Sequence, residues 1–356
     1  MTDHPLLFLP GPTEVDPDLL AAMSRPMIGH RQPEFVSLAR EVVRGLGGLF
    51  RTAQKTGFET CPATALMEAA VRNLPRGART LHLVCGAFSS RWAEISIRCG
   101  RDAEVFEVPM GCSHDAAALR DRLLTTPPYE AVAITHNETS TGAIEPLADL
   151  AATVRAISGE TLILVDAVSS FGGAPLHFDS FGLDLAFAGT QECLAPPPGL
   201  TVFAASDRFL RRAESAGERG FLFDLPRSIA SLQDGKTLAT PCVPLVFALE
   251  RQLQRIEAEG LENRWRRHQS MRDQTLDWAA RHGFEPFVPS AAARSWTVTC
   301  LRASGRDVGD LARRALGAGF AMDRGYGPLK GSTFRIGHLG DHDPSRLSAL
   351  LRAIAG

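Results

Sequence analysis

Short apolar runs alternate with amphipathic segments between about residues 56 and 205, and this alternation constrains the fold more than any other feature. Five runs of four or five residues carry few polar side chains: 81–84, 131–135, 162–166, 185–188 and 201–204. Apolar strands separated by helices are typical of parallel sheets that helices cover on both faces. The pattern therefore predicts an α/β fold with a large domain whose mostly parallel sheet lies between helices.

The pattern changes near residue 245. A helical stretch is expected from Leu245 to about His282, followed by shorter elements: strands at 296–301 and 333–336, and helices at 308–316 and from Pro344. The chain of 356 residues is 44% hydrophobic, which is enough for two cores. We therefore expect two domains. Residues 1–245 form an N-terminal arm and the large α/β domain, and residues 246–356 form a small C-terminal α+β domain.

Composition argues against several classes of partner. The net charge of −2 and the pI of about 6.6 give no reason to expect a nucleic acid or an anionic membrane. No apolar run approaches the roughly 18 residues that a membrane span needs. Seven cysteines lie singly, without C-x-x-C pairs or histidine clusters at metal spacing. These features predict a reduced, cytoplasmic protein without a structural metal.

Polar residues follow three of the predicted strands. Asp166 ends one apolar run, Glu138 and Thr139 follow another, and Glu192 follows a third. A carboxylate at the end of an apolar strand is costly unless it has a partner. Ligands of open α/β sheets bind beyond the carboxyl ends of the strands, so we expect these side chains to share one pocket.

Seven segments, spread along nearly the whole chain, carry a family resemblance: Pro10-Gly11-Pro12-Thr13, 63–70, 86–92, 135–142, 165–170, 260–265 and 334–340. In the same order, they resemble segments of the class V aminotransferase family, and of its alanine/serine–glyoxylate group most closely. The resemblance implies an aspartate aminotransferase-like fold type I with a seven-stranded sheet, pyridoxal phosphate (PLP) as cofactor, a homodimer, and a small amino acid or 2-oxo acid as substrate.

The resemblance implies roles on the ring side of the cofactor for three residues. Asp166 would pair with the pyridinium nitrogen and keep the ring an electron sink. Phe88 would stack on the ring, and Thr139 would contact the phenolic oxygen. Each residue has a structural alternative that stays open: a helix cap for Asp166, a core side chain for Phe88, and a turn hydroxyl for Thr139.

The resemblance also implies contacts to the phosphate and to the substrate. Ala63 and Thr64 open a helix whose free N–H groups suit a phosphate, although Thr64 could be a plain N-cap. Gln191 matches a phosphate contact, and Thr240 matches one that comes from the partner subunit. Arg335 matches the arginine that grips the substrate carboxylate with a planar fork, the alternative being an ion pair at the surface.

The loop from Ala188 to Gly199 departs from the family at its most important position. The family pattern is Gly-Ser-Gln-Lys-Ala-Leu-x-x-Pro-Pro-Gly, and Glu192 stands at the lysine. A lysine amine forms a Schiff base with the aldehyde of PLP, and a carboxylate cannot. Lys55, Lys236 and Lys330 are the only lysines, and none follows a strand end on the expected cofactor side.

Other segments of the predicted pocket depart as well. Pro62 removes an N–H donor from the phosphate loop. Segment 219–224 lacks the phenols that the family often has there, and segment 237–241 lacks an expected ring. The combined changes indicate a rebuilt pocket rather than a single exchange.

Three functions remain open. In the first, PLP or pyridoxamine phosphate (PMP) binds without a covalent bond, and Glu192 acts as general acid and base. In the second, no cofactor binds, and Glu192 and Arg335 act on a small carboxylic acid. In the third, the chain is a non-catalytic, dimeric binding or regulatory protein, with Glu192 in a salt bridge. Two like charges ~6 Å apart repel by about 3 kcal/mol at an effective dielectric constant of ~20, so an ionised Glu192 near a phosphate weakens binding.

Overall fold

A computed structural model describes residues 4–355 and is built around a seven-stranded sheet. All neighbouring strands run parallel except β10, which is antiparallel to both of its neighbours. The predicted mostly parallel, seven-stranded sheet is confirmed. In spatial order the strands are β2 (Lys55–Glu59), β10 (Thr201–Ala205), β9 (Leu185–Gly189), β8 (Leu162–Asp166), β5 (Ala131–Thr135), β3 (Arg79–Val84) and β4 (Asp102–Glu107).

The five predicted strands form the interior of this sheet, and alternate residues of each strand enter different cores. In β8, Ile163 and Val165 join one hydrophobic cluster, while Leu162 and Leu164 join the other. A strand buried on both faces needs an apolar side chain at every position, which explains the continuous apolar runs. The two edge strands, β2 and β4, carry more polar residues and do not stand out in the sequence.

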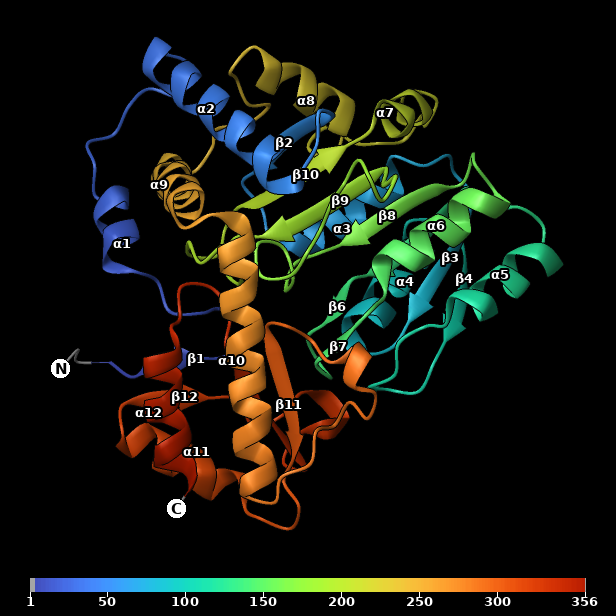
Figure 1. Cartoon of the computed structure of the whole chain (residues 1–356). Coiled ribbons are helices and arrows are strands. Elements are labelled where there is room, and N and C mark those ends of the chain that lie inside the picture. The colour runs from blue at the N-terminus through green and yellow to red at the C-terminus, as the bar shows by residue number, and fades with distance from the viewer. Residues whose placement is uncertain (1–3, 356) are drawn as a thin grey trace.

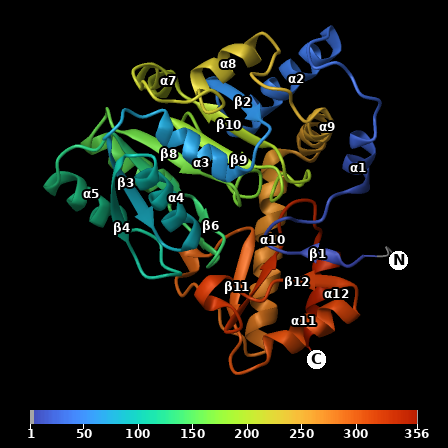
Figure 2. The same ribbon diagram turned by 180° about the vertical axis from the view of Figure 1, so that it is seen from behind.

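Helices cover both faces of the sheet. One face packs against α2 (Pro33–Phe50), α5 (Ala116–Thr125), α6 (Leu147–Ile157) and α9 (Val243–Glu259). The other packs against α3 (Ala63–Arg72), α4 (Ala87–Arg98), α7 (Asp207–Glu214) and most of α8 (Leu225–Gln233). Figure 1 shows α6 in front of the sheet, and Figure 2 shows α3 and α4 in front of it.

The C-terminal part has its own core. The elements that form or flank it are α10 (Leu261–Arg281), β11 (Val298–Arg302), α11 (Val308–Gly317), β12 (Phe320–Met322), β13 (Thr333–Gly337) and α12 (Pro344–Ala355). The helical stretch predicted from Leu245 to His282 is divided at Gly260, where φ is +80° and α9 gives way to α10. β11 pairs antiparallel with β13.

The division at residue 245 stays a prediction, and the packing adds two observations to it. Helix α9 buries its apolar face in the core of the large sheet. At the other end of the chain, β1 (Leu6–Phe8) pairs in parallel with β12, so the N-terminal arm lies against the C-terminal part. Helix α1 (Pro17–Met23), which follows β1 in the chain, packs beside α9.

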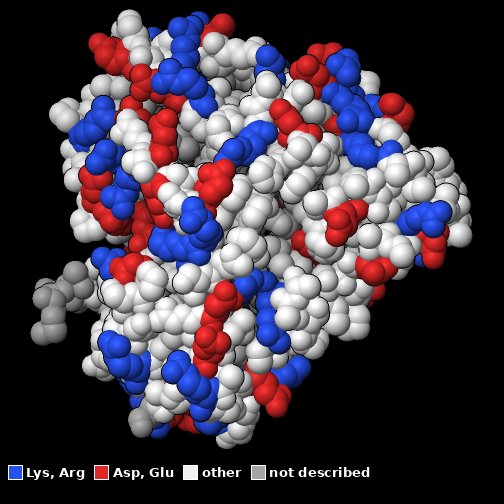
Figure 3. All heavy atoms as spheres, in the orientation of Figure 1, with Lys and Arg blue, Asp and Glu red and all other residues white. Residues whose placement is uncertain are grey.

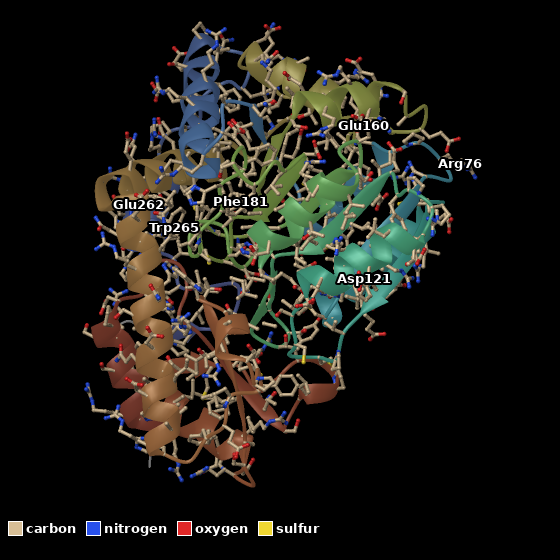
Figure 4. The ribbon with its side chains drawn as sticks, turned by 45° about the vertical axis from the view of Figure 1, so that its right-hand side comes forward. Arg76, Asp121, Glu160, Phe181, Glu262 and Trp265 are labelled. Carbon is tan, nitrogen blue, oxygen red and sulfur yellow. The ribbon has the colours of Figure 1, made fainter. Side chains whose placement is uncertain are left out.

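The long helix α10 joins the two parts (Figure 1). Near its first turn, Trp265 lies close to Phe181 of the large part (Figure 4). The ring of His177 contacts both, with centroids 5.4 Å from Phe181 and 5.5 Å from Trp265. Arg51, just after α2, pairs with Glu262 and lies over the Trp265 ring. These contacts tie α10 to the large part.

The face in Figure 3 carries positive and negative side chains intermixed, without a broad region of one sign. This distribution fits the net charge of −2. Within residues 4–355 no helix has the length and apolar character needed to cross a membrane.

Candidate functional site

Three parallel strands bring the candidate residues to one edge of the sheet. β5, β8 and β9 are neighbours that run in the same direction, so their carboxyl ends meet. Thr139 follows β5 after the short strand β6 (Asn137–Glu138), Asp166 ends β8, and Glu192 follows β9. β6 forms a hairpin with β7 (Ala143–Ile144). The three loops therefore start at one edge of the sheet, and that their side chains share one ligand pocket stays a prediction.

Glu192 is buried, with 8% of its surface exposed, and its Oε2 is buried without a hydrogen-bond partner among the described residues. Its backbone is fixed: the Ala195 N–H donates to the Glu192 carbonyl (3.0 Å), and the Thr13 N–H donates to the Gln191 carbonyl (2.9 Å). A Cβ on Gly11 would lie 2.6 Å from Glu192 Cγ. Only glycine at this position lets the N-terminal arm lie so close to the Glu192 side chain. An unpartnered buried oxygen is costly in a native core and is typical of a functional group.

The carboxyl groups of Glu192 and Asp166 influence each other. Burial raises the pKa of Glu192 well above its usual range, the charge of Asp166 raises it further, and Arg335 opposes both. Burial also raises the pKa of Asp166 to about 7, against the effect of the Val168 N–H, which donates to Oδ1 at 2.9 Å. Asp166 can therefore exchange a proton near neutral pH, and burial favours the protonated form of Glu192; both properties are useful for acid–base catalysis.

Arg335 lies on β13 and reaches across to the large part. Its Nε donates to Asp323 Oδ1 (2.7 Å) and its Nη1 to the carbonyl of Thr139 (2.8 Å). The Arg335 side chain is only 5% exposed. The ion pair that the sequence left open as an alternative is therefore present, but it is buried beside the other candidate residues rather than at the surface.

Phe88 lies in the first turn of α4, which a buried carboxylate caps. The Glu138 carboxylate accepts the N–H groups of Phe88 (3.1 Å) and Ser89 (3.0 Å) and the hydroxyl of Ser140 (2.5 Å). A Cβ on Gly86 would lie 2.5 Å from Glu138 Cγ, so glycine is required there. The carboxylate satisfies N–H groups that the start of the helix would leave free.

The Phe88 ring stacks on Tyr326 of the C-terminal part, with ring centroids 5.3 Å apart. Arg91 lies 4.9 Å from the Phe88 ring and donates to the Tyr326 hydroxyl at 2.9 Å. The ring is therefore half-buried against a second aromatic side chain rather than in the central core. Its role towards a cofactor stays a prediction.

The Thr139 hydroxyl has a partner within the protein: it donates to Ser169 Oγ at 2.7 Å. Its carbonyl accepts from Arg335, so Thr139 contacts residues from both parts of the molecule. The hydroxyl thus bonds to a side chain on another loop rather than to the local backbone of a turn, and Thr139 can still accept a hydrogen bond from a ligand.

The predicted phosphate residues lie in a more open region. Helix α3 starts at Ala63, and its N-cap is Pro62, which makes no side-chain capping bond. Ala63 is buried and Thr64 is exposed. The Gln191 amide folds back over Gly189, where a Cβ would lie 2.5 Å from Gln191 Oε1. No side chain caps the start of α3, which leaves the N–H groups of Ala63 and Thr64 for a ligand, while the Ala65 N–H donates to the Pro62 carbonyl at 2.9 Å.

Thr240 is exposed in the single chain and lines a cavity of about 120 Å³ together with Cys61 and Leu66. The neighbouring Cys242 N–H donates to Thr60 Oγ1 (3.0 Å), which holds this segment near the start of α3 of its own chain. The interpretation that Thr240 completes the site of a partner subunit stays a prediction.

The remaining lysines are exposed in this structure. Lys55 is the first residue of the edge strand β2, and Lys236 follows α8. Lys330 ends the turn before β13. None of the three lies in the buried cluster around Glu192, as the sequence predicts. Within residues 4–355, no group of three or more His, Cys, Asp or Glu side chains is arranged to hold a metal ion.

Sequence reasoning missed three residues of this cluster: Asp323, Tyr326 and Arg91. Asp323 and Tyr326 come from the loop between β12 and β13, and Arg91 from the second turn of α4. One signal was present for Tyr326, since the chain contains only two tyrosines. Nothing in the pattern pointed to Asp323, because its partner Arg335 lies on a neighbouring strand twelve residues later.

The profile of the family described as "Aminotransferase class-V" matches residues 60–325. A serine–glyoxylate aminotransferase of Methylorubrum extorquens is 32% identical, over 98% of this chain and 89% of its own. An uncharacterized aminotransferase of Methanocaldococcus jannaschii is 34% identical, over 94% of this chain and 88% of its own. The crystal structure of an alanine–glyoxylate aminotransferase from Nostoc sp. has a TM-score of 0.93 and 30% identity, covering 100% of this chain and 95% of its own.

Proposed function

Because the chain belongs to the class V aminotransferase family, we propose that it is an enzyme of small amino acids and 2-oxo acids that binds PLP or PMP without a covalent bond. Glu192 would act as the general acid and base. The observation that carries this proposal is the buried Glu192 Oε2, which has no hydrogen-bond partner and lies in the field of Asp166 and Arg335.

The proposal takes Glu192 to replace the lysine of the family. Glu192 follows β9, within the segment that resembles the lysine loop of the family. A carboxylate cannot condense with an aldehyde as a lysine amine does. A buried carboxyl group with a raised pKa can instead take up and return a proton near neutral pH. This supports proton transfer without covalent anchoring of the cofactor.

The ring side of the site fits the cofactor. When bound, the cofactor supplies an electron-withdrawing ring that weakens the bond between the substrate's α-carbon and its hydrogen. Asp166 Oδ1 or Oδ2 would share a proton with the ring nitrogen, and Thr139 would contact the phenolic oxygen. Glu192 Oε2 would take the proton from the α-carbon and return it, while Arg335 would orient the substrate carboxylate.

The phosphate side fits less closely. The N–H groups at the start of α3, with Ala63, Thr64 and Gln191 beside them, would hold the phosphate, and Thr240 of a partner subunit would add a contact in a homodimer. Pro62 offers no N–H. Together with the missing covalent bond, this predicts a cofactor that is held reversibly and exchanges slowly with solution.

A second function has an observation in its favour. Tyr326 covers the Phe88 ring, and Pro62 weakens the phosphate loop. Both would suit a cofactor-free enzyme in which Glu192 and Arg335 act on a small carboxylic acid. The third possibility, a non-catalytic dimeric binding protein, would use the same pocket without proton transfer.

The experiment is an absorption spectrum of the protein after incubation with PLP and desalting. We expect retained cofactor with a free-aldehyde spectrum that shifts when amino acids are added, and no cofactor trapped on the protein by borohydride. Glu192→Lys should permit borohydride trapping. The proposal would be contradicted if the wild type retained neither PLP nor PMP after desalting and bound neither of them in equilibrium dialysis. That result would favour the cofactor-free enzyme.

A further inference from the structure

The loop between β12 and β13 places a carboxylate directly on Arg335. Asp323 Oδ1 accepts from Arg335 Nε at 2.7 Å and from the Gly325 N–H at 2.8 Å, so two donors fix its position. The backbones pair as well, since the Arg335 N–H donates to the Asp323 carbonyl at 3.3 Å. Gly325 has a φ of +87°, and a Cβ there would lie 2.5 Å from the Leu329 carbonyl oxygen. The loop is built to hold Asp323 in this place.

The contacts occupy two of the five N–H groups of Arg335, and one of these is the Nε–H that a paired grip on a carboxylate often uses. An arginine grips a carboxylate through two N–H groups of neighbouring nitrogens. Here Nε already donates to Asp323 and Nη1 to the Thr139 carbonyl, and the Tyr326 ring lies 5.3 Å from Cζ. A substrate carboxylate would have to displace Asp323 or use the remaining donors.

The acidic side chains around Arg335 also disfavour the binding of a substrate carboxylate. Arg335 pairs with the carboxylate of Asp323 and lies within electrostatic reach of the carboxyl group of Glu192. A substrate carboxylate placed beside Arg335 would therefore lie close to the negative charge of Asp323, which disfavours it at low dielectric. Asp323 is partly open to solvent, with its side chain 22% exposed, and it lines a surface hollow of about 410 Å³ with Leu9 and Tyr326.

We propose that Asp323 is a specificity-determining residue that masks Arg335 and lowers the affinity of the pocket for a free substrate carboxylate. The small amino acids and 2-oxo acids proposed above as substrates would then bind only weakly through their carboxylate, and analogues in which the carboxylate is absent, amidated or esterified would bind about as well. The proposal rests on the proposed function in one respect, namely that the pocket around Glu192 and Arg335 binds the substrate.

The test is calorimetric titration of cofactor-free protein with propionate and with its neutral isostere propionamide. For the wild type we expect similar affinities for the two. Asp323→Asn keeps the shape and the acceptor for the Gly325 N–H but removes the charge, and should bind propionate at least tenfold more tightly with little change for propionamide. The double variant D323N/R335Q should lose this gain. Asp310→Asn, which breaks a surface pair with Arg314, is the matched control.

Two results would overturn the proposal: a folded D323N that binds propionate within twofold of the wild type, or a wild type that prefers propionate over propionamide by tenfold or more. The second comparison decides the question even if D323N does not fold. Because no cofactor is present, the result is independent of whether Glu192 transfers protons. A gain in D323N together with an inert Glu192 would refute the proposed function alone.

Discussion

The two ends of the candidate site are built differently. At the acid–base end, Asp166 and Arg335 are buried and hydrogen-bonded within the chain, and Glu192 has a buried oxygen without a hydrogen-bond partner among the residues that the structure describes. At the other end, Thr64 and Thr240 are exposed, and Pro62 caps α3 without a side-chain bond. Preorganised groups stabilise charge without rearrangement, whereas open groups must be ordered by a ligand or a second chain. The acid–base end is therefore expected to determine the chemistry. The end around Pro62, Thr64 and Thr240 is expected to determine the affinity for the cofactor.

The largest effect is expected at Glu192. Glu192→Gln keeps the size of the side chain but removes the proton carrier, so the rate of α-hydrogen exchange in the presence of PLP should fall by about 10²- to 10⁴-fold. Exchange of the α-hydrogen of alanine with D₂O, followed by NMR, measures this. Glu257→Gln, at an exposed position of α9, is the control. A wild-type rate in the E192Q variant would place the chemistry elsewhere.

The acid–base end also depends on a buried arginine. Arg264 Nη1 pairs with Asp341 (2.8 Å) and Glu259 (3.0 Å), and Nη2 donates to the carbonyl of Cys193, next to Glu192. Arg264→Met should lower the free energy of unfolding by roughly 1.5 to 3 kcal/mol, because it removes charged hydrogen bonds to Asp341 and Glu259, which keep Arg255 and Arg267 as partners. Urea unfolding measures it, with the exposed Arg266→Met as control. A loss no larger than that of R266M would show that the network does not stabilise this end.

The third effect is a pH dependence. Burial raises the pKa of Asp166 to about 7 from the model-peptide value of 3.8. The folded protein therefore holds this proton over a pH range in which the unfolded chain has lost it, and Asp166 makes folding less favourable as pH rises between those values. Relative to Asp166→Asn, the cofactor-free wild type should lose roughly 3 kcal/mol between pH 5 and 8. Urea unfolding of both proteins across this range measures the difference, and parallel curves would contradict the prediction.

The sequence predicted the buried end of the site better than its surroundings, for a physical reason. Asp166 and Glu192 follow strands that are buried on both faces, and such strands are visible as continuous apolar runs. The edge strand β4 is half-exposed and carries polar residues at several positions, so it was missed. Asp323 and Tyr326 were missed because their importance depends on contacts with β13 and α4, which sequence spacing does not encode.

The smallest effect is expected at the start of α3, where Pro62 lies. Pro62→Ala restores an N–H beside the start of α3. One hydrogen bond to a charged group contributes about 1.5 kcal/mol, so PLP should bind roughly tenfold more tightly. The gain exceeds the roughly 0.4–1 kcal/mol of stability that loss of a proline typically costs, and that cost falls on folding rather than on binding. Equilibrium dialysis with PLP measures it, and Pro128→Ala, in an exposed loop, is the control. If P62A binds PLP no more tightly than P128A, the start of α3 does not receive the phosphate. The cofactor-free use of Glu192 and Arg335 would then be the better explanation of why this end of the site is open.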